Sequence, residues 1–222
     1  MPSTTKTYAV ITGDIVDSSR FTGEARRQLL GYLKTALTVP AQILGSAVMA
    51  FPFDIHRGDS FQGVLQEPAE ALKAAVIIRA ALRSSLKTAL SNIIDARIAI
   101  GIGSITLMPD ATGGEGDGDA YRNSGLQLDL MMQNNRMLFV KTPKEEINKE
   151  LDVECALLDT LINKWSAEQA LAIIEILKGK TQQEMADIFN ISQPAIGKRL
   201  LSANLYALEL MLNRYDELMQ RM

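Results

Sequence analysis

The chain changes its hydrophobic periodicity once, near Lys164 and Trp165. Before this point short apolar β-type runs alternate with helical patterns, and after it only helical periodicity remains. The elements predicted up to about residue 163 follow the order β-α-β-β-α-β-α-β, which contains a ferredoxin-like unit, an antiparallel sheet with helices on one face. We therefore expect an α+β fold followed by an all-α domain.

Periodicity divides the chain into residues 1–142 (sheet domain), 143–165 (linking helix) and 166–222 (helical domain). The strands expected are 8–13, 48–55, 60–65, 97–103 and 137–140, and the helices expected before residue 165 are about 23–37, 69–86, 120–132 and 143–163. In the fourth strand Ala99, Gly101 and Gly103 lie opposite a row of isoleucines, so another segment should pack closely there.

The composition excludes several kinds of protein. With 47% apolar residues the chain can form a core, and a net charge of −3 does not suit a general nucleic-acid coat. The single cysteine, Cys155, excludes an internal disulfide framework and multi-cysteine metal sites. No apolar run approaches the roughly 20 residues of a membrane span, and we see no secretory signal. We expect a cytoplasmic protein with no membrane partner.

Two aspartates far apart in sequence are expected to meet. In a ferredoxin-like sheet the first and third strands are antiparallel neighbours, which places Asp14 beside Asp59. Two carboxylates at that distance repel unless they are protonated or neutralised by a cation, and Mg²⁺ prefers oxygen ligands. The alternative is structural: Asp14 would cap a turn, and Asp59 would complete a tight turn with Gly58.

The segment after Asp14 favours an anion. Residues 15–19 precede a helix, and the free N–H groups at a helix N-terminus attract phosphate. Together with the carboxylates this suggests a site for a metal-bound nucleotide triphosphate. His56, Asp117 and Asp119 are weaker candidates, because a lone histidine in a turn is more often solvated and acidic loops mostly aid solubility.

Residues 181–200 have the pattern of a helix-turn-helix. Thr181 is placed to cap the first helix, Asn190 suits a left-handed turn, and Ser192 is placed to cap the second helix. A helical hairpin used for packing or protein contacts is the alternative. If the second helix reads double-stranded DNA, the expected contacts are Ser192, Gln193, Gly197, Lys198 and Arg199.

The C-terminal segment carries an apolar stripe at alternating spacings of four and three, as in the seam of a coiled coil. Such a seam predicts a homodimer that presents two recognition helices to DNA. The same stripe would also suit a last helix folded back on its own chain. The residues expected to dimerise are Leu201, Leu205, Leu208, Leu212, Tyr215 and Met219, with Met222 continuing the spacing.

Four motifs occur in a distinctive order: TGDIVDSSRF at 12–21, RGDSFQG at 57–63, RIAIGIG at 97–103 and GDAYRNSG at 118–125. This order resembles the class III nucleotidyl cyclases, and with the helix-turn-helix the chain is similar to the bacterial SatD family. The resemblance implies a Mg²⁺ or Mn²⁺ site made by Asp14, Asp59 and the carbonyl of Ile15. The residues expected to bind phosphate or nucleotide are Asp17, Ser18, Ser19, Arg57, Arg122 and Asn123.

The sequence departs from the cyclases at three positions of that pattern. Their purine-reading lysine falls on Ile55, their asparagine on Arg122 and their transition-state arginine on Leu126. Losing a positioned transition-state donor typically costs about 10²–10³ in rate. We therefore expect ligand binding with little or no cyclase activity, unless Arg122 reaches phosphate from a shifted position.

Three functions compete. The first is a DNA-binding regulator whose degenerate cyclase-like domain senses a nucleotide or other phosphate ligand. The second is an active cyclase or phosphotransferase with regulatory C-terminal helices, and the third is an adaptor that binds protein. Ile55 and Leu126 argue against the second, and the helix-turn-helix pattern argues against the third. The first is the hypothesis we favour.

Overall fold

Five strands form one mixed sheet in the computed structural model, which describes residues 6–56, 58–85, 93–109 and 116–222. The order across the sheet is β2-β3-β1-β4-β5. β1 pairs antiparallel with β3 and β4, whereas β5 lies parallel to β4. β1 to β4 form the expected antiparallel ferredoxin-like unit, in the order β2-β3-β1-β4, and β5 adds a parallel strand because a helix crosses the sheet between β4 and β5. The strands are β1 (Tyr8–Ile15), β2 (Met49–His56), β3 (Ser60–Leu65), β4 (Ala96–Gly103) and β5 (Leu138–Lys141).

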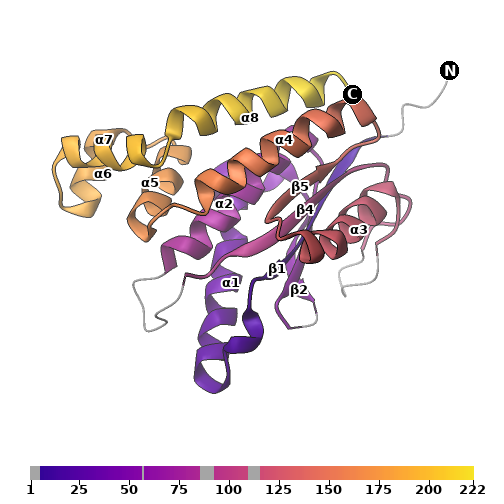
Figure 1. Ribbon diagram of the computed structural model, residues 1–222, viewed down its shortest axis with the longest axis horizontal. Helices are drawn as coiled ribbons and strands as arrows, with labels where there is room; N and C mark the ends of the chain where they lie inside the picture. The colour runs from indigo at the N-terminus through magenta and orange to yellow at the C-terminus, as the bar shows by residue number, and fades with distance from the viewer. Residues whose placement is uncertain (1–5, 57, 86–92, 110–115) are drawn as a thin grey trace.

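Helices α1 (Gly23–Leu44) and α2 (Ala71–Ser84) cover one face of the sheet (Figure 1), where they bury the isoleucines of β1 and β4. α1 continues beyond the end expected at residue 37 and includes Pro40, which is buried. Packing against the sheet therefore outweighs the helix-breaking tendency of proline here. Short 3₁₀ helices join the elements: η1 (Ser18–Arg20), η2 (Ser46–Val48) and η3 (Pro68–Glu70).

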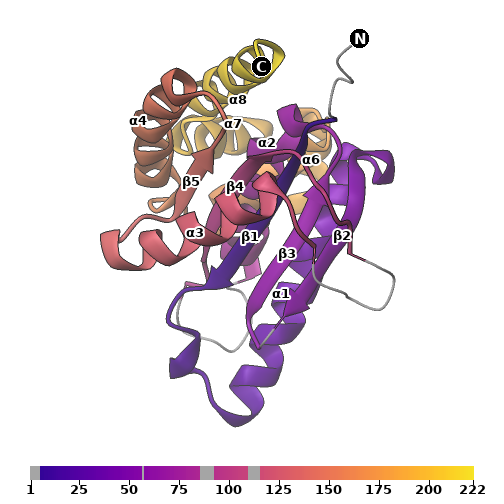
Figure 2. The same cartoon turned by 90° about the vertical axis from the view of Figure 1, so that its right-hand side faces the viewer.

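Helix α3 (Asp119–Asn134), which follows the ferredoxin-like unit in the sequence, lies on the opposite face of the sheet (Figure 2). Gly101 and Gly103 of β4 permit its close approach. A Cβ atom on Gly101 would lie only 2.1 Å from the carbonyl oxygen of Ala120. The prediction that another segment packs closely against this row of small residues is confirmed.

Five further helices complete the chain, and none of the helices in the described ranges is long and apolar enough to span a membrane. α5 packs against α2, and α2 is buried along almost its whole length. One buried apolar cluster runs from the sheet through α2 into α8. The helices are α4 (Glu145–Ile162), α5 (Ala167–Leu177), α6 (Gln182–Phe189), α7 (Gln193–Ser202) and α8 (Leu205–Gln220).

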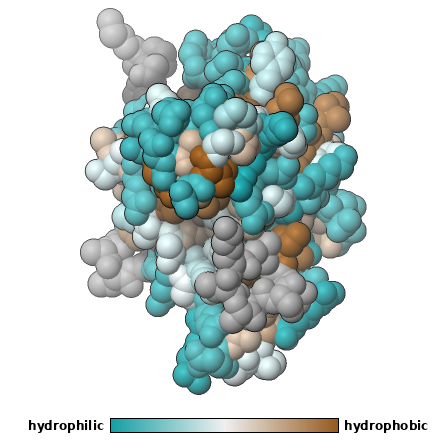
Figure 3. Space-filling model, turned by 90° about the vertical axis from the view of Figure 1, so that its left-hand side faces the viewer, coloured by the Kyte–Doolittle hydropathy of each residue, from teal (hydrophilic) through white to brown (hydrophobic). Residues whose placement is uncertain are grey.

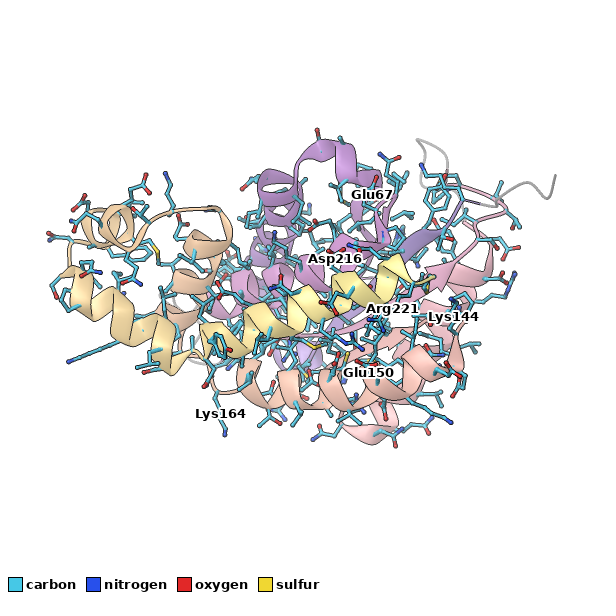
Figure 4. The ribbon with its side chains drawn as sticks, turned by 90° about the horizontal axis from the view of Figure 1, so that it is seen from above. Glu67, Lys144, Glu150, Lys164, Asp216 and Arg221 are labelled. Carbon is cyan, nitrogen blue, oxygen red and sulfur yellow. The ribbon has the colours of Figure 1, made fainter. Side chains whose placement is uncertain are left out.

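Helix α8 folds back along α4 of its own chain, as Figure 4 shows from above. Leu208 and Tyr215 are fully buried, and the Tyr215 hydroxyl donates to the carbonyl of Pro68 at 3.1 Å. The expected coiled-coil seam is therefore wrong, because intramolecular packing already buries its central residues. Leu205, Leu212 and Met219 pack partly buried against the same cluster, and Leu201 remains 79% exposed.

A buried ionic network joins the sheet to the C-terminal helices. Arg79 of α2 donates to both carboxylate oxygens of Asp95 at 2.9 Å and to Asp159 of α4 at 2.6 Å. Arg83 donates to Asp95 and to the backbone carbonyl of Asn163, both at 2.8 Å. Burial raises the pKa of Asp159, whereas the two arginines outweigh burial at Asp95 and hold its pKa below the ordinary value. We call this set the Arg79 network.

Candidate functional site

The carboxylate pair lies where the strand order predicted it. Asp14 is opposite Ser60 in the register of β1 and β3, so Asp59 is one residue away across the strands. Both side chains are mostly buried, at 16% and 18% exposure. Burial raises the pKa of Asp14, and the charge of Asp59 contributes to the rise. The predicted meeting of the two carboxylates is confirmed.

Each carboxylate has an arginine partner that the sequence did not single out. Arg97 of β4 lies 3.3 Å from Asp14, and Arg26 of α1 lies 3.2 Å from Asp59. Arg26 also donates to the carbonyl of Ser18 at 3.0 Å. Arg97 is directly opposite Asp14 in the strand register, so the predicted strand order could have revealed it. Arg26 required the position of α1 relative to the sheet.

The pair fits a divalent cation that arrives with an anionic ligand. Oδ1 of Asp14 is buried and has no hydrogen-bond partner in the described part of the chain. Two carboxylates with a free oxygen suit Mg²⁺ or Mn²⁺, but Arg26 and Arg97 already bring the formal charge of the cluster to zero. Among the described residues, no group of three or more His, Cys, Asp or Glu side chains is placed so that it could hold a metal ion. The remaining ligands would be the Ile15 carbonyl, phosphate oxygens and water.

The β1–α1 segment, predicted to receive phosphate, leads into α1 through the 3₁₀ helix η1. Asp17 adopts a left-handed conformation with φ of 55° and pairs with Arg20 at 3.1 Å. Ser18 and Ser19 lie in η1, whereas α1 begins only at Gly23. α1 therefore begins where the sequence predicted it, and these serines precede it; their contact with phosphate stays a prediction. Arg57, also expected to contact phosphate, is outside the described residues.

A cleft of about 450 Å³ lies on the α3 side of the sheet. Thr12 of β1 lies in its floor, two residues before Asp14 on the same face of the strand. Separate elements supply the rest of its lining, so no local sequence pattern could predict the cleft. The other residues that line it include Phe51, His56, Ser60, Gln62, Val64, Asp117, Tyr121 and Arg122.

The predicted ligand-binding residues of α3 have structural partners. Arg122 is exposed at the cleft and forms ion pairs with Asp117 at 2.7 Å and Asp119 at 3.0 Å. Asn123 donates to the carbonyl of Ile102 at 3.2 Å and so holds α3 to β4. Leu126, at the position of the cyclases' transition-state arginine, is 63% exposed.

The α6–α7 pair has the expected turn chemistry at two of its three predicted positions. The Thr181 hydroxyl accepts from the Glu184 amide at 3.2 Å, and the Glu184 carboxylate accepts from the Thr181 amide at 2.7 Å. Asn190 ends α6 in the left-handed region, with φ of 53°. Ser192 precedes α7, but its side chain accepts no capping hydrogen bond, so the prediction of a side-chain cap is wrong.

The outer surface of α7 is only partly open. Gln193 and Lys198 are exposed, whereas Gly197 and Arg199 are partly buried. Gln193 donates to the side-chain oxygen of Gln182 on α6 at 2.9 Å, and a Cβ atom on Gly197 would lie 3.3 Å from that same oxygen. Figure 3 shows the end of the molecule formed by these helices as mostly hydrophilic with a hydrophobic patch.

The fold and site define an α+β protein with a mixed sheet and a carboxylate pair at the ends of two adjacent strands. More specifically, the sequence model of the SatD family matches residues 8–214, and the chain belongs to this family. No curated protein matches the sequence.

Several solved cyclase structures are similar at low identity. A bacterial light-regulated adenylyl cyclase is 12% identical with a TM-score of 0.44, and the match covers 60% of this chain and 74% of that one. The GGEEF domain of a diguanylate cyclase from Vibrio cholerae is 17% identical with a TM-score of 0.44, and the match covers 63% of this chain and 85% of that one. A guanylyl cyclase domain from the fungus Blastocladiella emersonii is 19% identical with a TM-score of 0.42, and the match covers 56% of this chain and 74% of that one. These similarities are too low to assign an activity.

Proposed function

We propose that the sheet half of this protein binds a nucleotide or related phosphate ligand together with Mg²⁺ or Mn²⁺ at Asp14 and Asp59. The observation that carries the proposal is Oδ1 of Asp14, which is buried beside a second carboxylate and has no partner among the residues that the structure describes. A metal triphosphate brings both a cation for these carboxylates and negative charge for the neighbouring Arg26 and Arg97.

Each residue has a role in this proposal. Asp14, Asp59 and the Ile15 carbonyl would hold the cation, which when bound neutralises part of the phosphate charge. Arg97 keeps the Asp14 carboxylate in place, and Arg26 ties the Ser18 carbonyl to Asp59. The test is a thermal-shift screen of ATP, GTP, CTP and UTP with and without Mg²⁺. A ligand present at 100 times its dissociation constant stabilises by about 2.7 kcal/mol.

Little or no cyclic nucleotide should form when the purified protein is incubated with ATP or GTP and Mg²⁺ or Mn²⁺. The reason is that Ile55 and Leu126 carry no charge to read a purine or to stabilise the transferring phosphate. Chromatographic detection of the cyclic product measures this. Vigorous production would show that Arg122 or another group supplies the missing charge, and would establish the protein as an active cyclase.

We also propose that α7 contacts double-stranded DNA and that the protein acts as a ligand-responsive regulator. The support is local: α6 and α7 are joined by a left-handed asparagine turn, and Gln193 and Lys198 are exposed on α7. A homodimer remains part of this proposal, but it requires a surface other than the predicted seam. Leu210 of α8, which is 52% exposed and lies outside the predicted seam, is an apolar residue available for such a surface.

Replacing Lys198 and Arg199 together by alanine should weaken DNA binding and flatten its salt dependence. If both side chains meet phosphate, the slope of log K against log salt should fall in magnitude by about 1 to 2. Fluorescence anisotropy with duplex DNA at several salt concentrations measures this. The control replaces Arg27 and Lys34 of α1, which removes the same charge elsewhere. If the two double variants changed DNA binding equally, α7 would not be the DNA-contacting helix and would serve in packing or protein binding.

A further inference from the structure

A hydrogen-bonded relay crosses the floor of the cleft. The fully buried hydroxyl of Ser124 donates to the carbonyl of Tyr121 at 3.1 Å. Because a hydroxyl carries one proton, Ser124 must accept from Thr12, whose Oγ1 lies 3.0 Å from its Oγ. Thr12 in turn accepts from Nε2 of Gln62 at 2.9 Å. The relay therefore fixes the orientation of the Gln62 amide, and its Oε1 has no hydrogen-bond donor among the described residues.

The second group at the cleft is the hydroxyl of Tyr121. This side chain is only 8% exposed, and its hydroxyl has no hydrogen-bond partner within the described part of the chain. Burial raises the pKa of Tyr121 to about 12, so the hydroxyl keeps its proton at neutral pH and can donate. Leaving a buried hydroxyl unpaired is unfavourable, and a bound ligand would supply the missing acceptor.

The shape and lining of the cleft suit a flat ring. Phe51, Val64 and the ring of Tyr121 give it apolar walls, and Gln62 and Thr12 supply polar groups at its floor. Its volume of about 450 Å³ is within the range of small-molecule sites, roughly 300–1,000 Å³. Aromatic side chains favour planar heterocycles, which can stack on them or meet their edges.

We infer that this cleft binds the heteroaromatic base of a nucleotide. Oε1 of Gln62 accepts an N–H from the edge of the base, and the Tyr121 hydroxyl donates to an acceptor on that edge. Purines and pyrimidines both carry a donor next to an acceptor. Thr12 and Asp14 lie on one face of β1, so a base in the cleft would lie on the same face of the strand as phosphates at the carboxylates. The inference rests on the proposed nucleotide binding and assigns its base-reading residues.

Isothermal titration of the full chain with Mg²⁺ tests this. The probes are ATP, GTP, CTP and UTP, inorganic tripolyphosphate as the ligand without a base, and the four nucleosides as ligands without phosphate. We expect at least one nucleoside triphosphate to bind tenfold or more tightly than tripolyphosphate. Tyr121→Phe removes only the hydroxyl, so it should weaken that nucleotide roughly threefold to tenfold and leave tripolyphosphate unchanged.

A second variant tests the relay without touching the hydroxyl of Tyr121. Thr12→Val keeps the shape of the side chain but frees the Gln62 amide to rotate, so the ratio between the best and worst nucleotide should shrink. Tyr206→Phe on α8, where the tyrosine is 75% exposed, is the matched control and should change nothing. The melting temperature of each variant shows that it is folded.

The outcomes separate this inference from the function on which it rests. Equal affinity for nucleotides and tripolyphosphate would overturn the inference that the cleft binds a base, but it would agree with the proposed phosphate site. Binding of nucleosides that Tyr121→Phe weakens, with no binding of tripolyphosphate, would support the cleft and overturn the metal–phosphate site. Absence of binding by every probe would overturn both. A Tyr121→Phe variant with unchanged affinities would overturn the assignment of its hydroxyl.

Discussion

Replacing Asp14 by asparagine is expected to abolish the Mg²⁺-dependent stabilisation of the protein by its nucleotide. The substitution keeps the size of the side chain but removes its charge, so the cation loses one of its two carboxylates. With ligand at 100 times its dissociation constant, the wild-type melting temperature should rise by roughly 5–10 °C. The variant should show no more than the small shift seen without metal.

The matched control is Asp129→Asn on α3. Asp129 is exposed and lies outside every predicted binding residue, so this variant should keep the full ligand-induced shift. Acidification should mimic Asp14→Asn in the wild type. Because the pKa of Asp14 lies above 3.8, its carboxylate becomes protonated at a higher pH than an ordinary aspartate, and the metal-dependent shift falls there. An unchanged shift in Asp14→Asn would remove the proposed metal site.

Replacing Arg79 by methionine should cause the largest loss of stability. Arg79 is fully buried between Asp95 and Asp159, and its removal leaves buried carboxylates without their main partner. Breaking a buried ion pair in this way costs about 3–5 kcal/mol. For a chain of this length that corresponds to a fall of roughly 6–20 °C in melting temperature, measured by calorimetry or circular dichroism.

Arg27→Met is the control for this loss, because Arg27 is 78% exposed and pairs only with Glu24 within its own helix. Its melting temperature should stay close to that of the wild type. The pH dependence supplies a second check. The depressed pKa of Asp95 contributes stability that is present above its unfolded value and lost as the pH falls. This acid-induced loss should be smaller in Arg79→Met, and equal stability of the two variants would contradict the importance of the network.

The sequence predicted the parts of the fold that depend on element order. The alternation of strands and helices places the first strand beside the third, and this alone brings Asp14 and Asp59 together. The residues of the cleft could not be predicted in the same way. Gln62 lies on β3 and Tyr121 on α3, and helix α2 and strand β4 separate these two elements in the sequence. Only the packing of α3 on β4 brings the two residues to one cleft.

Periodicity also failed to identify what covers an apolar stripe. The stripe of α8 fits a coiled coil and a folded-back helix equally well, and the structure shows the second. In α2, Arg79 and Arg83 lie outside the predicted apolar stripe, as solvent-facing residues would. They are buried because α4 and the segment that follows it supply partners that come about 80 residues later.

The position of Asp95 has a consequence for communication between the two ends of the molecule. Its backbone carbonyl accepts from the amide of Val16, two residues beyond Asp14, while its carboxylate is held by Arg79 and Arg83. Arg83 reaches on to the joint between α4 and α5. A ligand that displaced the end of β1 would therefore shift Asp95, and through Arg83 it would shift the segment between α4 and α5.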